Sequence, residues 1–257
     1  MLIDFDLNLA DLSRFSVLIQ GVTNAGKTHL ACDMLRTERA AGPVAFLDIT
    51  GEEGTASGSH MDLGKIGKRA SSKQDVMDFA AYCVKEKVHA TALDGARHLY
   101  ATIMYDVMKA GGASNLPRLP DAKLDGERAR TYWSNTRFEF EQVITAVKTS
   151  VNILLATSVC AVDVHEITGE KKIAPDIYGK AGYGLAGCFD FAGYLFSRNL
   201  GPGRIERRVS FQSRNDVQTR QRLAYPLTDD LVLLDGFGSW GKIKAALEAG
   251  LKKREGK

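Results

Sequence analysis

The chain has 257 residues and a formal net charge of +3, from 34 basic and 31 acidic side chains. A hydrophobic content of 44% and a charged content of 25% are ordinary for a globular domain with a sizeable core, and they exclude a wholly disordered chain. The small charge excess excludes a strong global field, so any contact with nucleic acid would depend on local basic loops.

The first part of the chain alternates between apolar runs and amphipathic segments. The run FSVLIQ at residues 15–20 ends at a glycine and predicts a buried strand, and helical spacing begins at Lys27. Two further strands are expected at residues 43–48 and 88–94, each ending in an aspartate. Helices are predicted at residues 73–87 and 96–108, and loops at residues 51–72 and 109–127.

The second part opens with a long helix, predicted over residues 128–150, and an apolar strand at residues 151–157. Residues 160–187 mix charges and glycines and predict a long loop. Two strands, at residues 189–197 and 204–213, flank an NLGPG turn and predict a β-hairpin.

Apolar residues at positions 240–251 have helical spacing and predict a C-terminal helix, with Ser239 as its N-cap. Alternation of strands and helices favours an α/β fold with a mostly parallel sheet flanked by helices. We expect a single domain over residues 1–257, with a core at about 15–215 and an extension at about 216–257.

Several classes of site and location are disfavoured. The four cysteines form no CxxC pair, so free thiols in a reducing compartment are expected rather than a zinc site: Cys32, Cys83, Cys160 and Cys188. The N-terminal residues lack the basic start and apolar core of a signal peptide. No run of about 18 apolar residues predicts a membrane span, and we expect a cytoplasmic protein in its host cell.

The segment GVTNAGKT at residues 21–28 fits G-x-x-x-x-G-K-[ST], between a predicted strand and a predicted helix. Backbone N–H groups of such a P-loop converge on the β-phosphate of a nucleoside triphosphate, at the positive end of the following helix. The lysine lies by the β- and γ-phosphates, and the threonine hydroxyl binds Mg²⁺. The expected nucleotide-binding residues are Gly21, Val22, Thr23, Asn24, Ala25, Gly26, Lys27, Thr28 and His29.

The alternative interpretation of this segment is a glycine turn that merely precedes a helix. A chance match to the pattern in a chain of this length is on the order of 1%. The strand before the segment and the helix after it lower that chance further, so we expect ATP and Mg²⁺ as ligands.

A P-loop requires an acid at the end of a neighbouring strand, and Asp94 is the best candidate for this second magnesium-site residue, with Thr28 as the first. The alternative role of Asp94 is that of an aspartate starting a turn. Candidates for activating water are Asp48, Glu52 and Glu53, each of which could equally be a surface acid. At the next strand end, Thr157 and Ser158 could sense the γ-phosphate or simply cap the strand.

The order of the segments GVTNAGKT, AFLDITGEE, ATALDG, NILLATS and KAGYGLAGCFDFAGYLFSRN resembles that of a RecA-like P-loop ATPase core. The chain is most similar to small phage ATP-binding proteins of this class, some of which act in single-strand DNA annealing and recombination. The resemblance covers about residues 15–215. It implies that Lys27 and Thr28 bind phosphate and magnesium, that Asp94 is the second-motif acid, and that a phage-encoded chain acts in the host cytoplasm.

Two positions depart from the family. In RecA-like proteins the strand matching residues 45–50 often ends in a glutamate that activates water, whereas here Thr50 stands at that place. Either Glu52 or Glu53 substitutes, or hydrolysis is slow. The strand matching residues 153–158 ends in a glutamine in RecA, and here it ends in Thr-Ser.

The resemblance also implies single-stranded DNA as a partner, bound by loops matching residues 109–130 and 160–182. The basic residues of these loops could contact phosphates or form a solvated charged surface: Lys109, Arg118, Lys123, Arg128, Arg130, Lys171, Lys172 and Lys180. Tyr178 and Tyr183 could stack on bases.

RecA-like ATPases usually assemble as oligomers and bind nucleotide between subunits, where a basic residue of the neighbour reaches the γ-phosphate. Lys180, Arg198 and Arg214 are candidates for this role in a homo-oligomer. Arg207 and Arg208 are expected to be surface charges, and strand alternation lets only one of them face a given partner.

Three functions remain open. The first is an ATPase of DNA recombination or single-strand annealing. The second is a P-loop kinase of a small molecule, since residues 118–130 contain three arginines that could form a lid. The third is an assembly switch that binds ATP without hydrolysing it, as the threonine at position 50 suggests.

Overall fold

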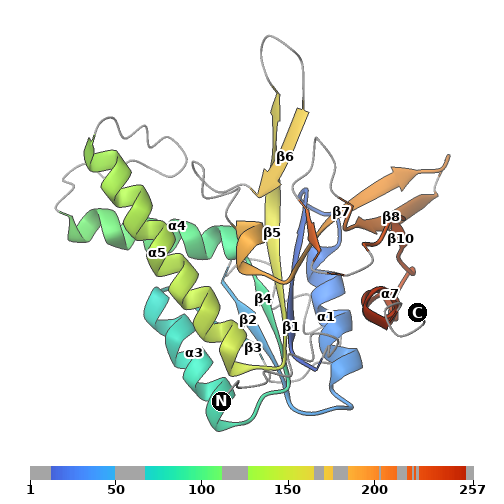
Figure 1. The fold of residues 1–257 in the computed structure, drawn as a ribbon, viewed down its shortest axis with the longest axis horizontal. Helices are drawn as coiled ribbons and strands as arrows, with labels where there is room; N and C mark the ends of the chain where they lie inside the picture. The colour runs from blue at the N-terminus through green and yellow to red at the C-terminus, as the bar shows by residue number, and fades with distance from the viewer. Residues whose placement is uncertain are drawn as a thin grey trace, which may run out of the picture.

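The computed structural model describes residues 13–49, 67–111, 127–164, 171–175, 185–202, 204–212, 219–221, 223 and 226–252. Its sheet has the strand order β10-β8-β7-β1-β5-β4-β2-β3, with β6 paired to β5 and β9 paired to β7 (Figure 1). The strands are β1 (Phe15–Gly21), β2 (Val44–Asp48), β3 (Gly67–Arg69), β4 (Ala90–Asp94), β5 (Ile153–Val164), β6 (Lys171–Pro175), β7 (Phe191–Asn199), β8 (Ile205–Ser210), β9 (Arg220–Gln221) and β10 (Leu231–Val232).

The centre of the sheet is parallel and its additions are antiparallel. β1 pairs in parallel with β5 and β7, β4 with β5 and β2, and β2 with β3. The β7–β8 hairpin, β6, β9 and β10 pair antiparallel. Every residue of β1, β2 and β4 is buried, because a central parallel strand is covered on both faces. The prediction of an α/β fold with a mostly parallel sheet and a late hairpin is confirmed.

Helices cover both faces of this sheet (Figure 1). On one face α1 (Lys27–Glu38) and α7 (Ser239–Lys252) bury a core with the apolar side chains of β1, β7 and β8. On the other face α3 (Lys73–Lys85), α4 (Ala96–Ala110) and α5 (Glu127–Ser150) bury a second core. None of the helices in the described ranges has both the length and the apolar character that a membrane span requires.

Two predicted loops contain strands. The loop expected at residues 160–187 is wrong in part: β5 continues to Val164 and forms an antiparallel hairpin with β6, which projects beyond the sheet (Figure 1). A short 3-10 turn, Ala186–Cys188, also falls in it. The loop expected at residues 51–72 contains β3, which extends the sheet beside β2. These strands lack an apolar alternation, so pairing with a neighbour rather than their own pattern defines them.

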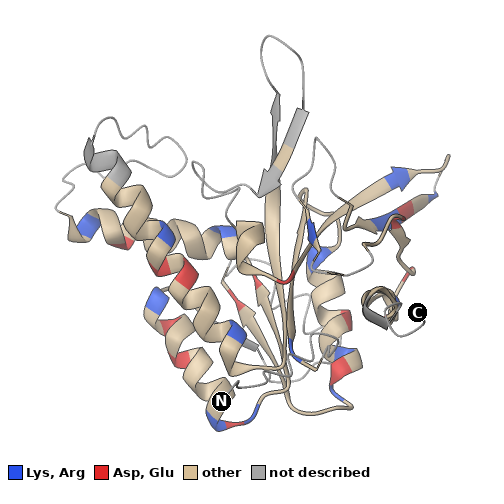
Figure 2. Ribbon diagram, viewed as in Figure 1, with Lys and Arg blue, Asp and Glu red and all other residues tan. Residues whose placement is uncertain are grey.

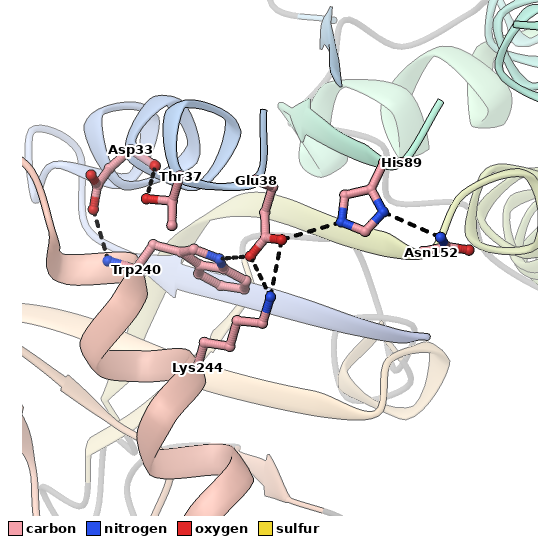
Figure 3. Close-up of polar contacts among 7 residues, drawn as sticks. All are labelled: Asp33, Thr37, Glu38, His89, Asn152, Trp240 and Lys244. Atoms are coloured by element: carbon pink, nitrogen blue, oxygen red, sulfur yellow. Dashed lines mark hydrogen bonds and ion pairs between the residues drawn. The ribbon is translucent and has the colours of Figure 1, made fainter. Parts of the chain in front are cut away.

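The C-terminal helix begins at Ser239 rather than after it, and an acid of another helix caps it. Asp33 of α1 accepts a hydrogen bond from the backbone N–H of Gly238 at 2.8 Å and another from the backbone N–H of Trp240 at 2.7 Å, the latter drawn in Figure 3. The Ser239 hydroxyl instead accepts from the backbone N–H of Leu234 at 2.9 Å. The N-cap prediction for Ser239 is therefore wrong, and a carboxylate satisfies the free N–H groups from outside the helix.

A second acid of α1 fastens the same helix. Glu38 is almost fully buried and accepts hydrogen bonds from Trp240 Nε1 at 2.7 Å and from Lys244 Nζ at 2.9 Å (Figure 3). His89 Nε2 lies 3.2 Å from the same carboxylate. Burial alone would raise the pKa of Glu38, but the hydrogen bonds and charge of Lys244 and the Trp240 bond outweigh it, so the pKa lies below its ordinary value.

The cysteines follow the expectation of free thiols. Cys32, Cys83 and Cys160 are buried and Cys188 is half-buried, and none of them forms a disulfide. Burial raises the pKa of Cys32 to about 12, so this thiol stays protonated.

Candidate functional site

The glycine-rich turn (residues 21–28) joins the end of β1 to the start of α1, as the sequence predicts. Asn24 (φ 63°) and Gly26 (φ 96°) adopt the left-handed backbone conformation that a tight strand-to-helix turn requires. Gly21 packs directly on β7, because a Cβ atom there would lie 2.5 Å from the carbonyl oxygen of Leu195. The turn therefore brings the free N–H groups of α1 to the carboxyl end of the parallel strands.

Lys27 folds back over the glycine-rich turn. Its ammonium donates hydrogen bonds to the carbonyl oxygens of Gly21 at 3.0 Å and Val22 at 2.7 Å. Burial lowers the pKa of Lys27, and its electrostatic interactions with Cys160 and Asp94 oppose that shift. The ammonium thus lies at the mouth of the turn, held by two carbonyl oxygens that an anionic ligand could replace.

Three residues from α1, β4 and β5 meet beside the turn: Thr28 in the first turn of α1, Asp94 at the end of β4 and Thr157 within β5. Thr28 Oγ1 donates a 2.7 Å hydrogen bond to Oδ2 of Asp94, and Thr157 Oγ1 donates to Oδ1 of the same carboxylate. Thr157 also accepts a 3.2 Å bond from the backbone N–H of Gly95. Both oxygens of the nearly buried Asp94 carboxylate are therefore oriented by hydroxyl groups.

Two other expected residues, Asp48 and Ser158, differ in how they lie relative to Asp94. Asp48 is fully buried at the end of β2 and stands in register with Asp94 on β4, so the two acids share one face of the sheet. Ser158 lies one residue after Thr157, and its hydroxyl bonds only the neighbouring carbonyl of Val159, at 3.3 Å, among the described residues. Of the two hydroxyls, only Thr157 joins the Asp94 site.

His29, the last residue of the expected nucleotide set, faces the C-terminal segment. Its Nε2 lies 2.8 Å from the carbonyl oxygen of Gly236, and its ring stacks on Phe237 with centroids 5.5 Å apart. The guanidinium of Arg36 lies 4.2 Å from the centre of the same phenyl ring. His29 therefore joins α1 to the loop before α7.

Several predicted residues lie outside the described part of the chain. They are Thr50, Glu52, Glu53, Arg118, Lys123, Tyr178, Lys180, Tyr183 and Arg214. Arg128, Arg130, Lys171 and Lys172 lie in α5 and β6, but their side chains are not described. Arg198 is exposed near the end of β7, and Lys109 is exposed at the end of α4.

The sequence interpretation missed the position of Arg207 on β8. Its Nε lies 3.3 Å from the place that a Cβ atom of Gly26 would occupy, so this exposed side chain borders the glycine-rich turn. Alternation along the strand predicts that only one of the Arg207–Arg208 pair faces a given partner. Which of them does so depends on the packing of β8 beside β7 and β1.

The described residues contain no group of three or more His, Cys, Asp or Glu side chains that could hold a metal ion. A magnesium site does not require one, since Mg²⁺ usually keeps several waters and takes one or two protein ligands plus phosphate oxygens. The joined hydroxyl and carboxylate of Thr28 and Asp94 are oxygen donors of that kind. Comparison of the chain with protein-family models and with curated proteins found no match.

Proposed function

We propose that the protein binds ATP with Mg²⁺ at the glycine-rich turn, as a P-loop ATPase with a RecA-like core. The hydrogen bond between Thr28 and Asp94 is the observation that carries the proposal. It joins the threonine that follows the lysine of the motif to an acid at the end of another strand. That strand, β4, is separated from β1 by β5, so tertiary structure rather than chain proximity brings the two together.

Each residue of the site would have a separate role in binding the phosphates or the metal. The backbone N–H groups of the turn would receive the β-phosphate, and Lys27 would exchange its bonds with the Gly21 and Val22 carbonyls for the β- and γ-phosphates. Thr28 would hold Mg²⁺ through its hydroxyl, and Asp94 would hold the metal's water shell. Bound magnesium supplies the charge that neutralises the phosphate oxygens. Thr157 would keep the Asp94 carboxylate oriented.

The group that orients the attacking water is to be found among Asp48, Glu52 and Glu53. Asp48 shares a sheet face with Asp94, which puts a second buried acid near the proposed magnesium site. Replacing each acid by its amide and comparing single-turnover hydrolysis identifies the group. The amide at the water-activating position lowers the hydrolysis rate while leaving ATP affinity nearly unchanged.

The proposed role of ATP turnover is in recombination or annealing of single-stranded DNA, by a homo-oligomer. The exposed arginines of the β7–β8 hairpin support the proposed binding of single-stranded DNA. Arg198 and Arg204 could contact the phosphate backbone locally, although the chain as a whole has only a small positive charge. Figure 2 shows basic residues on this hairpin together with the acid Glu206 of β8, and acidic and basic residues mixed along α3 and α5.

The test is the ATPase rate with and without single-stranded DNA, together with the particle size in each state. We expect turnover that single-stranded DNA raises and that Lys27→Ala abolishes. Turnover indifferent to every nucleic acid would contradict the DNA role while leaving the ATPase intact. Phosphate transfer to a small acceptor would instead indicate a kinase, and tight ATP binding with almost no hydrolysis would indicate an assembly switch.

A further inference from the structure

Arg207 reaches the glycine-rich turn because of its place in the sheet. Two and four residues further along, Val209 and Phe211 are buried in the core that α1 and α7 cover. Since side chains alternate along a strand, Arg207 lies on this same face, beyond the edge of that core. Arg208 points to the opposite face, where its Nε lies 2.5 Å from Glu206 Oε1 in an ion pair.

The guanidinium of Arg207 borders the turn at the residue before Lys27. A Cβ atom on Gly26 would lie 3.3 Å from Arg207 Nε and 3.4 Å from Arg207 Cδ. Within the described part of the chain, no carboxylate forms an ion pair with Arg207. The N–H donors of its guanidinium therefore lie beside the turn at which we propose that phosphate binds. A guanidinium can donate two parallel hydrogen bonds to a phosphate group.

The strand order indicates which phosphates Arg207 can reach. Asp94 ends β4, and the order β8-β7-β1-β5-β4 puts β4 and β8 on opposite sides of β1. The Thr28–Asp94 bond marks the magnesium side of the turn, where the β- and γ-phosphates lie. Arg207 approaches from the other side, toward the end of the polyphosphate that leads to the nucleoside.

We propose that Arg207 binds the α- and β-phosphates of the nucleotide held by its own chain. This inference rests on the proposed nucleotide-binding function and deepens it. Because ADP contains both of these phosphates, Arg207 contributes equally to ATP and ADP affinity and does not distinguish the γ-phosphate. It is a binding residue supplied in cis, different from the residues of a neighbouring subunit expected to reach the γ-phosphate.

Calorimetric titration of ATP and ADP with Mg²⁺ into the full-length protein tests the inference. Arg207→Ala weakens the affinity for both nucleotides by a similar factor, on the order of tenfold. Arg207→Lys keeps the positive charge but loses the paired N–H donors of the guanidinium, so it recovers part of the lost nucleotide affinity. Arg208→Ala, the matched control on the opposite face, leaves both affinities near those of the wild type. Arg207 is exposed, and an unchanged thermal midpoint verifies that each variant is folded.

Three results would overturn the inference. Equal nucleotide affinities for Arg207→Ala and the wild type would show that the guanidinium does not bind phosphate. A loss for ATP with none for ADP would move Arg207 to the γ-phosphate. Wild-type protein that binds neither nucleotide would remove the proposed function itself, which separates that failure from a failure of Arg207 alone.

Discussion

The Thr28 hydroxyl donates a 2.7 Å hydrogen bond to Oδ2 of Asp94, although 66 positions separate the two residues in the chain. β5 lies between β4, which Asp94 ends, and β1, which leads into the turn before Thr28, and Thr157 of β5 donates to the other carboxylate oxygen. The start of α1, the end of β4 and the middle of β5 thus converge on one carboxylate at the edge of the sheet where the glycine-rich turn lies. Carboxyl ends of parallel strands are the usual place for a ligand in an α/β sheet, and the predictions below follow from that convergence.

Asp94→Ala should lower magnesium-dependent ATP turnover by on the order of 100-fold, because it removes the acid that we propose holds the metal's water shell. ATP affinity should change far less, since the turn and Lys27 remain. Steady-state hydrolysis and equilibrium ATP binding measure the two effects separately. Asp106→Ala, which removes an exposed acid from α4, is the matched control. Normal turnover by Asp94→Ala would show that another acid serves the metal.

Thr157→Val should lower turnover by about tenfold, because Thr157 orients the acid of the proposed magnesium site and outer-shell partners of metal sites typically contribute 10- to 100-fold. The change keeps the shape of the side chain but removes its bonds to Asp94 and to the Gly95 N–H. Buried polar groups left without a partner cost about 1–3 kcal/mol each, so urea unfolding should also show a loss of stability. Ser158→Ala, its neighbour, should leave turnover nearly unchanged; a larger effect there would reverse the assignment.

Lys27→Met should abolish useful ATP affinity without destabilising the nucleotide-free protein. Burial lowers the pKa of Lys27 in the folded state, so its charge opposes folding at every pH below the folded pKa. The free-energy cost of burying the charged Lys27 disappears as the pH rises from the pKa of the folded state toward the pKa of the unfolded state, near 10.4. The advantage of Lys27→Met in the free energy of unfolding should therefore shrink as the pH rises through that interval. ATP binding equal to the wild type would refute the assignment of the turn as a P-loop.

Glu38→Gln should destabilise the protein by about 2–3 kcal/mol, because it leaves the Lys244 ammonium without its buried carboxylate. The pKa of Glu38 is lowered in the folded state, so the ionised group stabilises the fold above its unfolded pKa. This contribution is lost as the pH falls from about 4.3, the unfolded value, through the folded pKa. The wild type should lose stability over that interval more steeply than Glu38→Gln.

The fluorescence of Trp240 reports on the same contact, since its indole N–H donates to Glu38. In a Trp133→Phe background it is the only tryptophan of the sequence, so an acid-induced change in emission follows the docking of α7 on α1. Glu248→Gln, which removes a half-buried acid of α7 without a contact to Glu38, is the control. An identical acid transition in Glu38→Gln would show that Glu38 is not the titrating group.

Local patterns predicted much of this molecule. The apolar runs, the helical spacings and the glycine spacing of residues 21–28 are sufficient to identify β1, α1, β2, β4 and the β7–β8 hairpin. Asp94 could be selected as a strand-ending acid because the carboxyl ends of parallel strands share one edge. Such features depend on residues close in the chain, whose backbone preferences and periodicity are readable in order.

Other features depended on contacts between distant segments. Ser239 looks like a helix cap, yet the cap is Asp33, more than 200 residues away. Arg207 and Arg208 are equivalent in the sequence, and only the packing of β8 on the α1 side separates them. β6 has no strand pattern of its own, and hydrogen bonding to β5 makes it a strand. The sequence by itself thus determined the glycine-rich turn and the sheet that holds it. Tertiary packing decided which charges surround that turn, because burial and pairing join residues that no local pattern relates.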